Sequence, residues 1–214
     1  MSAAAERSRG SLATGAAILI VVAVLYAWLG NAVSHRPPAG IDAAARSIAG
    51  EAPGVAWVFT ESCLWPVLTA FGLAGCIVAL RTRAWRGRIV FSVATTVVAW
   101  QASNVLKDLF ARPRPSYWLV AHETTFSYSS GHAMFATIVY WLWSYYIARS
   151  PLPGAVRVPL SIALAGWGIG VIWSRLALGA HYPSDLAGGV LLGFAMLALG
   201  SLAARAVAPR ARVL

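Results

Sequence analysis

Six apolar stretches, each close to the length of a membrane-spanning helix, alternate with short polar segments along the chain. They cover Leu12–Val33, Val55–Leu80, Ile89–Phe110, Ala133–Ala148, Pro159–Leu178 and Leu186–Ala206. A helix needs about 20 apolar residues to cross the hydrocarbon core of a bilayer. The pattern therefore predicts an all-α integral membrane protein, a bundle of six transmembrane helices.

Three of these stretches depart from a plain spanning helix. Ala133–Ala148 is the shortest, and we expect its helix to begin near His132. Val55–Leu80 contains Pro66, which should kink or loosen the helix. The first stretch is longer than the apolar core of a signal peptide and is not followed by a convincing small-residue cleavage site, so we interpret it as an uncleaved span.

Composition agrees with a membrane protein of one domain. The chain has 214 residues, of which 59% are hydrophobic and only 11% are charged, whereas a soluble domain carries about a quarter charged residues. We interpret residues 1–214 as one domain, with residues 1–11 and 207–214 as cytoplasmic tails. The weakly amphipathic stretch Ile41–Ile48 is either a helix on the outer membrane surface or an ordered linker.

The net charge of +10 does not indicate nucleic acid, because the arginines lie in short loops rather than in a basic helix. Most of them fall on the side that holds both termini, which the positive-inside rule makes cytoplasmic in the plasma (inner) membrane. The other side holds Arg36, Arg46, Lys107, Arg112, Arg114 and Arg175. The last four flank three short polar motifs, which indicates that this extracytoplasmic face binds an anion.

Two of the three motifs supply cations. Lys107 lies near the end of the third apolar stretch, Arg114 follows in the loop, and Arg175 lies near the end of the fifth stretch. An arginine can hold two phosphate oxygens through its planar fork, and a lysine adds a point charge. Together they could neutralise a phosphoryl group in its transition state. We interpret Arg112 as an ordinary cation at a helix end, and we assign Asp108 no catalytic role.

The motif Ser130-Gly131-His132 stands where a loop turns into the fourth apolar stretch. A helix N-terminus offers backbone N–H groups and a favourable dipole to an anion, and glycine lets that backbone come close. Ser130 can donate a hydroxyl hydrogen bond or act as the N-cap. His132 would point from the first turn toward the same anion.

His181 and Asp185 are four residues apart at the start of the sixth stretch. If the helix starts that early, they share a face, and Asp185 could accept a hydrogen bond from one ring nitrogen of His181. The other ring nitrogen would then be available to attack. Two histidines near one phosphate favour a division into a nucleophile and a proton donor, with a phosphohistidine as the intermediate.

Each of these residues alone also has a structural interpretation. A lone Lys107 or Arg175 is more often a cation that extends to the membrane surface, and a lone His132 is more often a helix cap. His181 and Asp185 could be a structural pair within the bundle. The conjunction of all three motifs on one predicted face favours catalysis.

The three motifs resemble the signature of the type-2 phosphatidic acid phosphatase family, which is related to the vanadium-dependent haloperoxidases. Lys107, six residues and then Arg114-Pro115 match the first part, Ser130-Gly131-His132 the second, and Ser174-Arg175, His181 and Asp185 the third. Order and internal spacing both match. The resemblance covers roughly Lys107 to Asp185, and the six-span layout extends it over the chain. One position departs from the pattern, because Ser129 stands where the family usually has proline.

The resemblance implies His181 as nucleophile, Asp185 as its orienting partner and His132 as general acid. It implies that the phosphate ligands are Lys107, Arg114, Ser130, Gly131 and Arg175. It also implies a reaction without metal or other cofactor, at the extracytoplasmic membrane surface. We expect Ser129 to restore an N–H and some flexibility to the anion loop, with a modest effect on rate.

The resemblance leaves the substrate open among membrane lipid phosphates. Phosphatidic acid, phosphatidylglycerol phosphate, undecaprenyl pyrophosphate and lipid A phosphates all fit. Phosphotransfer to an alcohol is the alternative enzyme activity, and a transporter or flippase for anionic lipid is the alternative without chemistry. A haloperoxidase would need bound vanadate. The oligomeric state is not predicted, and His122 and Glu123 either contact substrate or are solvated.

Overall fold

The computed structural model describes residues 3–117 and 124–207, and in these ranges all regular structure is helical. In chain order the elements are α1 (Ala3–Ser34), α2 (Ile41–Ala44), η1 (Ala45–Ser47), α3 (Pro53–Glu61), α4 (Trp65–Arg81), α5 (Arg83–Phe110), α6 (Gly131–Phe135), η2 (Ala136–Trp141), α7 (Leu142–Ala148), α8 (Gly154–Ala177) and α9 (Pro183–Val207). The prediction of an all-α chain is confirmed for the described residues.

Four of the described helices are long and apolar enough to cross a membrane: Leu12–Ser34 within α1, and the whole of α5, α8 and α9. The second predicted span is divided into α3 and α4, which meet at an angle of 42° and together could form a fifth span. The break lies at Ser62–Leu64, just before Pro66 in the first turn of α4. Proline has no backbone N–H to donate, and its ring clashes with the carbonyl one turn earlier. A helix therefore does not continue unbroken through Pro66, and the predicted kink falls there.

The fourth predicted span is the one that the structure does not confirm. Its residues are helical but divided among α6, the π-helical segment η2 and α7, and it is not among the described helices that qualify as candidate spans. The structure thus supports four or five spans rather than the six predicted. A π-helical segment widens one turn of a helix and often lies near a functional site.

Two of the segments between the apolar stretches contain helix. In the polar segment between the second and third apolar stretches, α5 already begins at Arg83, because arginine is a good helix former. Ile41–Ile48 folds into α2 and η1 with Asp42 buried. Of the two cysteines, Cys63 is buried in the break before α4, whereas Cys76 is exposed on α4.

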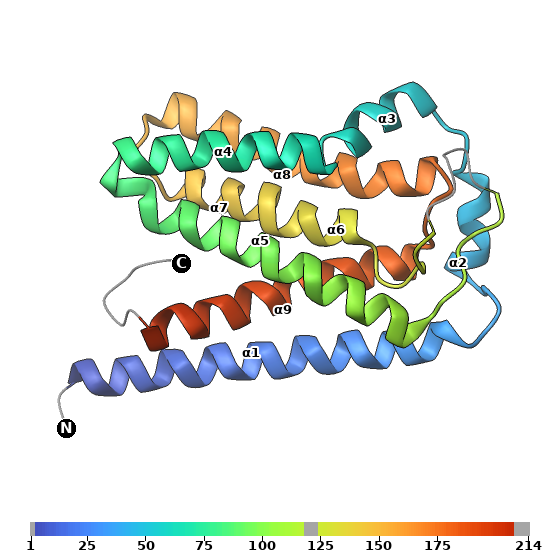
Figure 1. The fold of residues 1–214 in the computed structure, drawn as a ribbon, viewed down its shortest axis with the longest axis horizontal. Coiled ribbons are helices and arrows are strands. Elements are labelled where there is room, and N and C mark those ends of the chain that lie inside the picture. The colour runs from blue at the N-terminus through green and yellow to red at the C-terminus, as the bar shows by residue number, and fades with distance from the viewer. Residues whose placement is uncertain (1–2, 118–123, 208–214) are drawn as a thin grey trace.

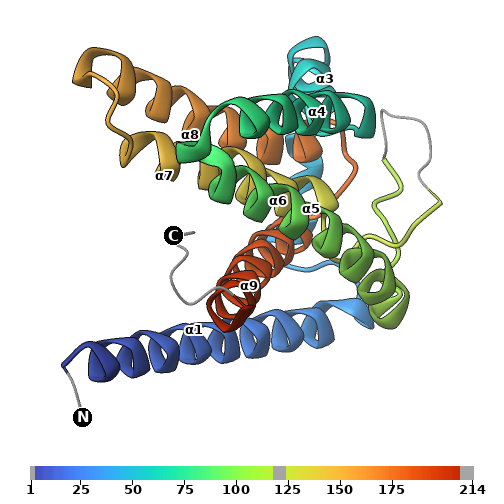
Figure 2. The same cartoon turned by 60° about the vertical axis from the view of Figure 1, so that its left-hand side comes forward.

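The last helix, α9, runs through the middle of the bundle. In Figure 1 it lies between α1 and α5, and Figure 2 shows it nearly end-on with other helices around it. Of the 18-residue apolar stretch that marks α9 as a candidate span, 44% is buried, against 6% of the corresponding stretch in α1. Glycines allow this packing: a Cβ on Gly189 would lie 2.3 Å from the Ser130 carbonyl oxygen. The absent side chain lets the loop before α6 rest directly on α9.

Candidate active site

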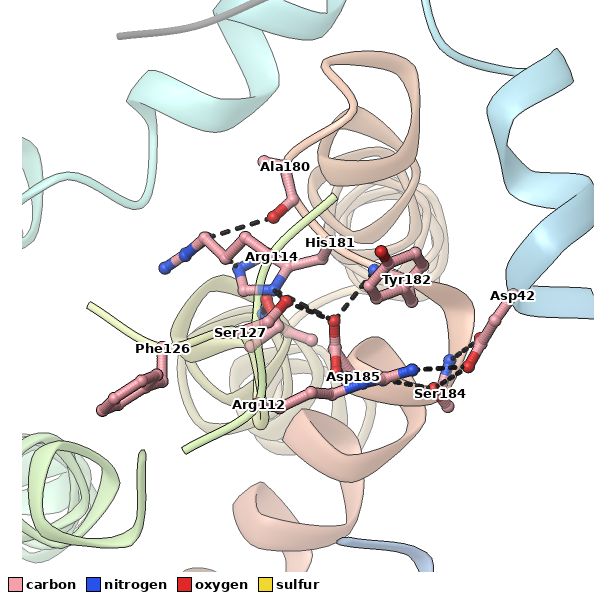
Figure 3. A network of polar contacts seen from close by, with 12 residues as sticks. Asp42, Arg112, Arg114, Phe126, Ser127, Ala180, His181, Tyr182, Ser184 and Asp185 are labelled. Carbon is pink, nitrogen blue, oxygen red and sulfur yellow. Dashed lines mark hydrogen bonds and ion pairs between the residues drawn. The ribbon is translucent and has the colours of Figure 1, made fainter. Parts of the chain in front are cut away.

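Three segments that are far apart in the sequence meet at one end of the bundle, beside α2 (Figure 1). They are the turn after α5, the segment that leads into α6, and the connection from α8 to α9. Two backbone hydrogen bonds join them: Ser127 donates to the Arg112 carbonyl at 2.9 Å, and Ser130 donates to the Asp185 carbonyl at 3.0 Å. The three sequence motifs therefore form one site, part of which Figure 3 shows from close by.

His181 and Asp185 are paired through a serine rather than directly. Because α9 begins at Pro183, His181 lies before the helix and does not share its face. The imidazole Nδ1 is 3.6 Å from Asp185 Oδ2, too long for a good hydrogen bond. Ser127 Oγ donates to Asp185 Oδ2 at 2.5 Å and lies 3.3 Å from Nδ1 of His181. The direct hydrogen bond predicted from the spacing is therefore wrong, and Ser127 bridges the two groups.

The contact at the other ring nitrogen fixes the tautomer of His181. Arg114 Nη1 lies 3.2 Å from His181 Nε2, and a guanidinium can only donate hydrogen bonds. Nε2 must then be the acceptor, so the proton of the neutral ring is on Nδ1 and faces Ser127 (Figure 3). An imidazole with a lone pair on Nε2 is the form that can act as a nucleophile.

Lys107 and Arg114 hold the segment before α6 against the site. Lys107 Nζ donates to the Phe126 carbonyl at 3.0 Å, and Arg114 Nε donates to the Thr125 carbonyl at 2.7 Å. Arg114 also donates through Nη2 to Thr125 Oγ1 at 2.9 Å and through Nη1 to the Ala180 carbonyl at 3.1 Å. Backbone oxygens thus orient both cations next to His181.

The third predicted phosphate ligand, Arg175, lies in the last turn of α8 and is 1% exposed. Its Nη1 donates to Thr60 Oγ1 at 3.3 Å, and Thr60 in turn lies 2.8 Å from Ser174 Oγ. Thr60 belongs to α3, so the helix before the break helps to position Arg175. The sequence patterns did not indicate Thr60, which lies more than a hundred residues before its partners.

Ser130 is the N-cap of α6, as the sequence predicts. Its side-chain oxygen accepts a hydrogen bond from the Ala133 N–H at 3.4 Å. A Cβ on Gly131 would meet no atom within 4 Å, so the backbone there borders open space. Ser129, in place of the family proline, is 1% exposed, and its hydroxyl lies 3.4 Å from the Tyr26 hydroxyl. Serine at this position therefore contacts α1.

His132 lies in the first turn of α6, outside the candidate spanning helices. Its Nε2 is buried and has no hydrogen-bond partner among the described residues. Burial lowers the pKa of His132 well below its usual range, and the charges of Arg175, Lys107 and Arg114 lower it further. The ring is therefore neutral in the absence of an anion, because three cations face it and disfavour a fourth positive charge.

The structure adds a buried network that sequence patterns did not predict. Arg112 Nη1 lies 2.5 Å from Asp185 Oδ1 and 2.7 Å from Ser184 Oγ, and Arg112 Nη2 lies 2.8 Å from Asp42 Oδ2. The interpretation of Arg112 as an ordinary helix-end cation is therefore wrong, since the residue is only 2% exposed. The scarcity of acidic residues, seven in the chain, was the signal that could have drawn attention to Asp42.

The structure describes one of the two histidines that belong to none of the motifs. His35 is exposed beyond the end of α1. His122 and Glu123 lie outside the described residues. Among residues 3–117 and 124–207, no group of three or more His, Cys, Asp or Glu side chains is placed to hold a metal ion.

Comparison with known proteins gives a consistent picture. The sequence pattern of the PAP2 superfamily matches residues 85–207. Phosphatidylglycerophosphatase B of Bacillus subtilis is 30% identical over 148 residues, which cover 68% of this chain and 70% of the relative. Decaprenylphosphoryl-5-phosphoribose phosphatase of Mycobacterium tuberculosis is 30% identical over 140 residues, covering 63% and 69%.

Two further comparisons differ in how much of the chain they cover. Phosphatidylglycerophosphatase B of Escherichia coli is 34% identical over 112 residues, but these cover only 50% of this chain and 42% of the relative. The crystal structure of a transmembrane PAP2-type phosphatidylglycerolphosphate phosphatase from Bacillus subtilis superposes with a TM-score of 0.76 at 21% identity. It covers 91% of this chain and 98% of that chain, so the fold is shared. Together with the long apolar helices, this likeness identifies a multi-pass membrane protein.

Proposed function

The chain belongs to the PAP2 superfamily, and from this premise we propose that it removes phosphate from a membrane lipid through a phosphohistidine on His181. Its named relatives are phosphatases of lipid phosphates, and the chain is a phosphoric monoester hydrolase of this kind. The finer parts of the proposal are the covalent intermediate, the roles of the residues, the membrane face and the choice of lipid.

One observation carries the proposal: the hydrogen bonds around His181 select the tautomer with an available Nε2. Ser127 Oγ faces the protonated Nδ1, and Arg114 Nη1 lies 3.2 Å from Nε2, which carries the lone pair. A phosphate that binds Arg114 would bring its phosphorus close to that lone pair. A cation beside Nε2 disfavours protonation of that nitrogen and so keeps its lone pair. A nucleophile needs this lone pair, whereas a purely structural histidine does not.

The first step is in-line transfer of the phosphoryl group. Nε2 of His181 attacks phosphorus while the bond to the leaving lipid oxygen breaks. That oxygen takes a proton from His132, which has taken it up from solvent when the phosphate bound. Lys107, Arg114 and Arg175, with the backbone N–H groups after Ser130, stabilise the charge on the equatorial oxygens. Asp185, through Ser127, stabilises the positive charge that develops on the imidazole.

The second step regenerates the enzyme. His132, now neutral, takes a proton from a water molecule that attacks the phosphohistidine, and the P–N bond breaks to release inorganic phosphate. The same histidine therefore acts as acid and then as base, and His181 returns to its neutral tautomer. No group outside the chain, the substrate and water is needed to balance these two steps.

A phosphate carried at the membrane surface suits a site at the end of the bundle. Glycerophospholipid phosphates such as phosphatidylglycerol phosphate and phosphatidic acid, and polyprenyl phosphates such as undecaprenyl pyrophosphate, are our candidate substrates. One relative is named a phosphatidylglycerophosphatase, and another is named a decaprenylphosphoryl-5-phosphoribose phosphatase, whose substrate carries a polyprenyl group. We place the site on the extracytoplasmic face, because the positive-inside rule assigns the opposite end of the bundle to the cytoplasm.

The test is phosphate release by the detergent-purified protein from a panel of these lipids, measured with and without EDTA. We expect release by the wild type and by His35→Ala, whose histidine is exposed outside the site, but not by His181→Ala. Activity that survives in His181→Ala would overturn the nucleophile assignment. Activity lost with EDTA and restored by a divalent ion would overturn the metal-free mechanism.

Two alternative functions give different outcomes in the same assay. A phosphotransferase would release little phosphate until an alcohol or second lipid is added, and the phosphate would then appear on that acceptor. A lipid transporter or flippase would release none, and His181→Ala would leave lipid binding and movement intact. Product analysis by mass spectrometry separates all three.

A further inference from the structure

Asp42 connects the N-terminal part of the chain to the site, although it lies outside residues 85–207 that match the superfamily. It belongs to α2, a four-residue helix in the connection from α1 to α3. Figure 3 shows its carboxylate pointing at Arg112 and Ser184, at the edge of the network away from His181. None of the three sequence motifs includes it.

The contacts of Asp42 are short and buried. Oδ2 accepts from Arg112 Nη2 at 2.8 Å and from Ser184 Oγ at 2.5 Å, and Oδ1 accepts from the Ser184 backbone N–H at 3.0 Å. The side chains of Asp42, Arg112 and Asp185 are 6%, 3% and 0% exposed. Three buried charges in a row, negative, positive and negative, are costly to assemble and are retained only where each is paired.

The order of these charges matters for His181. Arg112 alone would neutralise Asp185, leaving little negative charge to stabilise a cation on the imidazole. Asp42 on the far side of Arg112 offsets its charge, so that the row as a whole carries one net negative charge. A phosphorylated or protonated His181 adds the positive charge that balances the row.

The other charged groups near the ring make this balance necessary. Arg114 contacts Nε2 directly, and Lys107 and Arg175 add two further cations to the same site. Among the charged groups of the described residues that we place at the site, only Asp185 and Asp42 are negative. Removing one of these two carboxylates therefore removes half of the negative charge at the site.

We propose that Asp42 is a positioning residue for the phosphatase reaction: through Arg112 and Ser184 it holds Asp185 and keeps the row negative enough to stabilise the cationic form of His181. The inference rests on the proposed function of His181. It assigns to the segment before α3 a part in catalysis, beyond that of a connection between helices.

The first test is steady-state kinetics of Asp42→Asn, which is nearly isosteric. We expect kcat to fall by about 10- to 100-fold, the loss typical when an outer partner of a reacting group is removed. KM should stay within about twofold, because Asp42 contacts no phosphate ligand in the described structure. Asp108→Asn is the matched control, because Asp108 is exposed on α5 and should leave both constants unchanged.

The second test separates charge from structure. Asp42→Asn with Arg112→Gln removes one negative and one positive charge, so the row regains its net charge of minus one. We expect the double variant to turn over faster than Asp42→Asn alone, by about fivefold or more, which is the sign of coupling between neighbours. If both changes acted only on structure, the double variant would be as slow as or slower than the single one.

Asp42→Glu completes the series, since it keeps the charge and should retain most of kcat. If Asp42→Asn does not fold, Asp42→Glu and the double variant carry the test, and a double variant as inactive as His181→Ala overturns the inference. Wild-type activity that depends on His181, with Asp42→Asn at the wild-type rate, overturns the inference but not the proposed function. Activity that survives in His181→Ala overturns both.

Discussion

The two histidines of the site differ in how far the protein itself completes their surroundings. His181 has a partner at each ring nitrogen, Ser127 at Nδ1 and Arg114 at Nε2. His132 has a buried Nε2 with no hydrogen-bond partner among the described residues. The protein itself therefore orients the proposed nucleophile, whereas Nε2 of the proposed acid is left for an oxygen of the substrate.

This difference has a physical cause. A buried nitrogen without a hydrogen bond costs about 1–3 kcal/mol, and three nearby cations keep the pKa of His132 low. A phosphate dianion would supply an acceptor and offset those cations, and both effects raise the pKa of His132 toward the range in which it can donate. We therefore expect substrate binding to favour the protonated form of His132.

The largest expected effects come from the two histidines, and only the effect at His132 should depend on the leaving group. His181→Ala should lower kcat by at least about 10⁴-fold with any substrate, because no nucleophile remains. His132→Gln should lower it by about 10²- to 10⁴-fold with a lipid, but by less than about tenfold for the transfer step with p-nitrophenyl phosphate, whose leaving group needs no proton. Pre-steady-state release of nitrophenolate measures this; equal losses with both substrates would contradict the division of roles.

The next effect concerns Asp185, which we propose orients the nucleophile. Asp185→Asn keeps the shape but can donate a hydrogen bond to Ser127, which favours the wrong tautomer of His181. We expect a loss of about 10³- to 10⁴-fold in kcat, similar to that known when the carboxylate of a catalytic triad becomes an amide. A loss below tenfold would show that Nε2 is available without the carboxylate.

A smaller effect is expected for Ser127→Ala, which removes the bridge but leaves both ends in place. Nδ1 and Oδ2, now 3.6 Å apart, can approach or admit water, so we expect a loss of about 10-fold in kcat with little change in KM. Ser129→Ala is the matched control, because its hydroxyl faces Tyr26 instead. An effect of Ser129→Ala as large as that of Ser127→Ala would argue against a specific bridge.

The smallest expected effect is the uptake of a proton when an anion binds. Tungstate stays a dianion near neutral pH, and we expect its binding to take up as much as about one proton above the lowered pKa of His132. The uptake should decrease as pH falls through that pKa, because the free protein then already carries the proton. Calorimetry in buffers of different ionisation enthalpy measures it, and equal uptake by His132→Gln would assign the proton to another group.

The sequence predicts the parts of the site that lie within motifs. Lys107, Arg114, Ser130, His132, Arg175 and His181 meet at one end of the bundle because each lies at the end of an apolar stretch. Helix ends are visible in a hydropathy pattern, so their convergence follows from the order of the spans. The N-cap role of Ser130 is local as well and was predictable from its type.

The parts that depend on loop geometry were not predictable. Arg112 lies two residues before Arg114, yet one is buried against Asp42 and the other contacts His181. Only the path of the turn after α5 separates these outcomes. Asp42 and Ser127 reach Asp185 and its neighbours from distant sequence positions, and the π-helical form of η2 arises from packing that no hydropathy pattern contains.

The most direct test of the account is to trap the phosphorylated enzyme. His132→Gln, given p-nitrophenyl phosphate, lacks the base for the second step and should accumulate the intermediate, which rapid alkaline quenching preserves as an N-linked phosphate. Mass spectrometry is expected to find close to one phosphate per chain, on His181. Turnover that depends on His181 with no phosphate on that residue, or phosphate on a different residue, would contradict the mechanism.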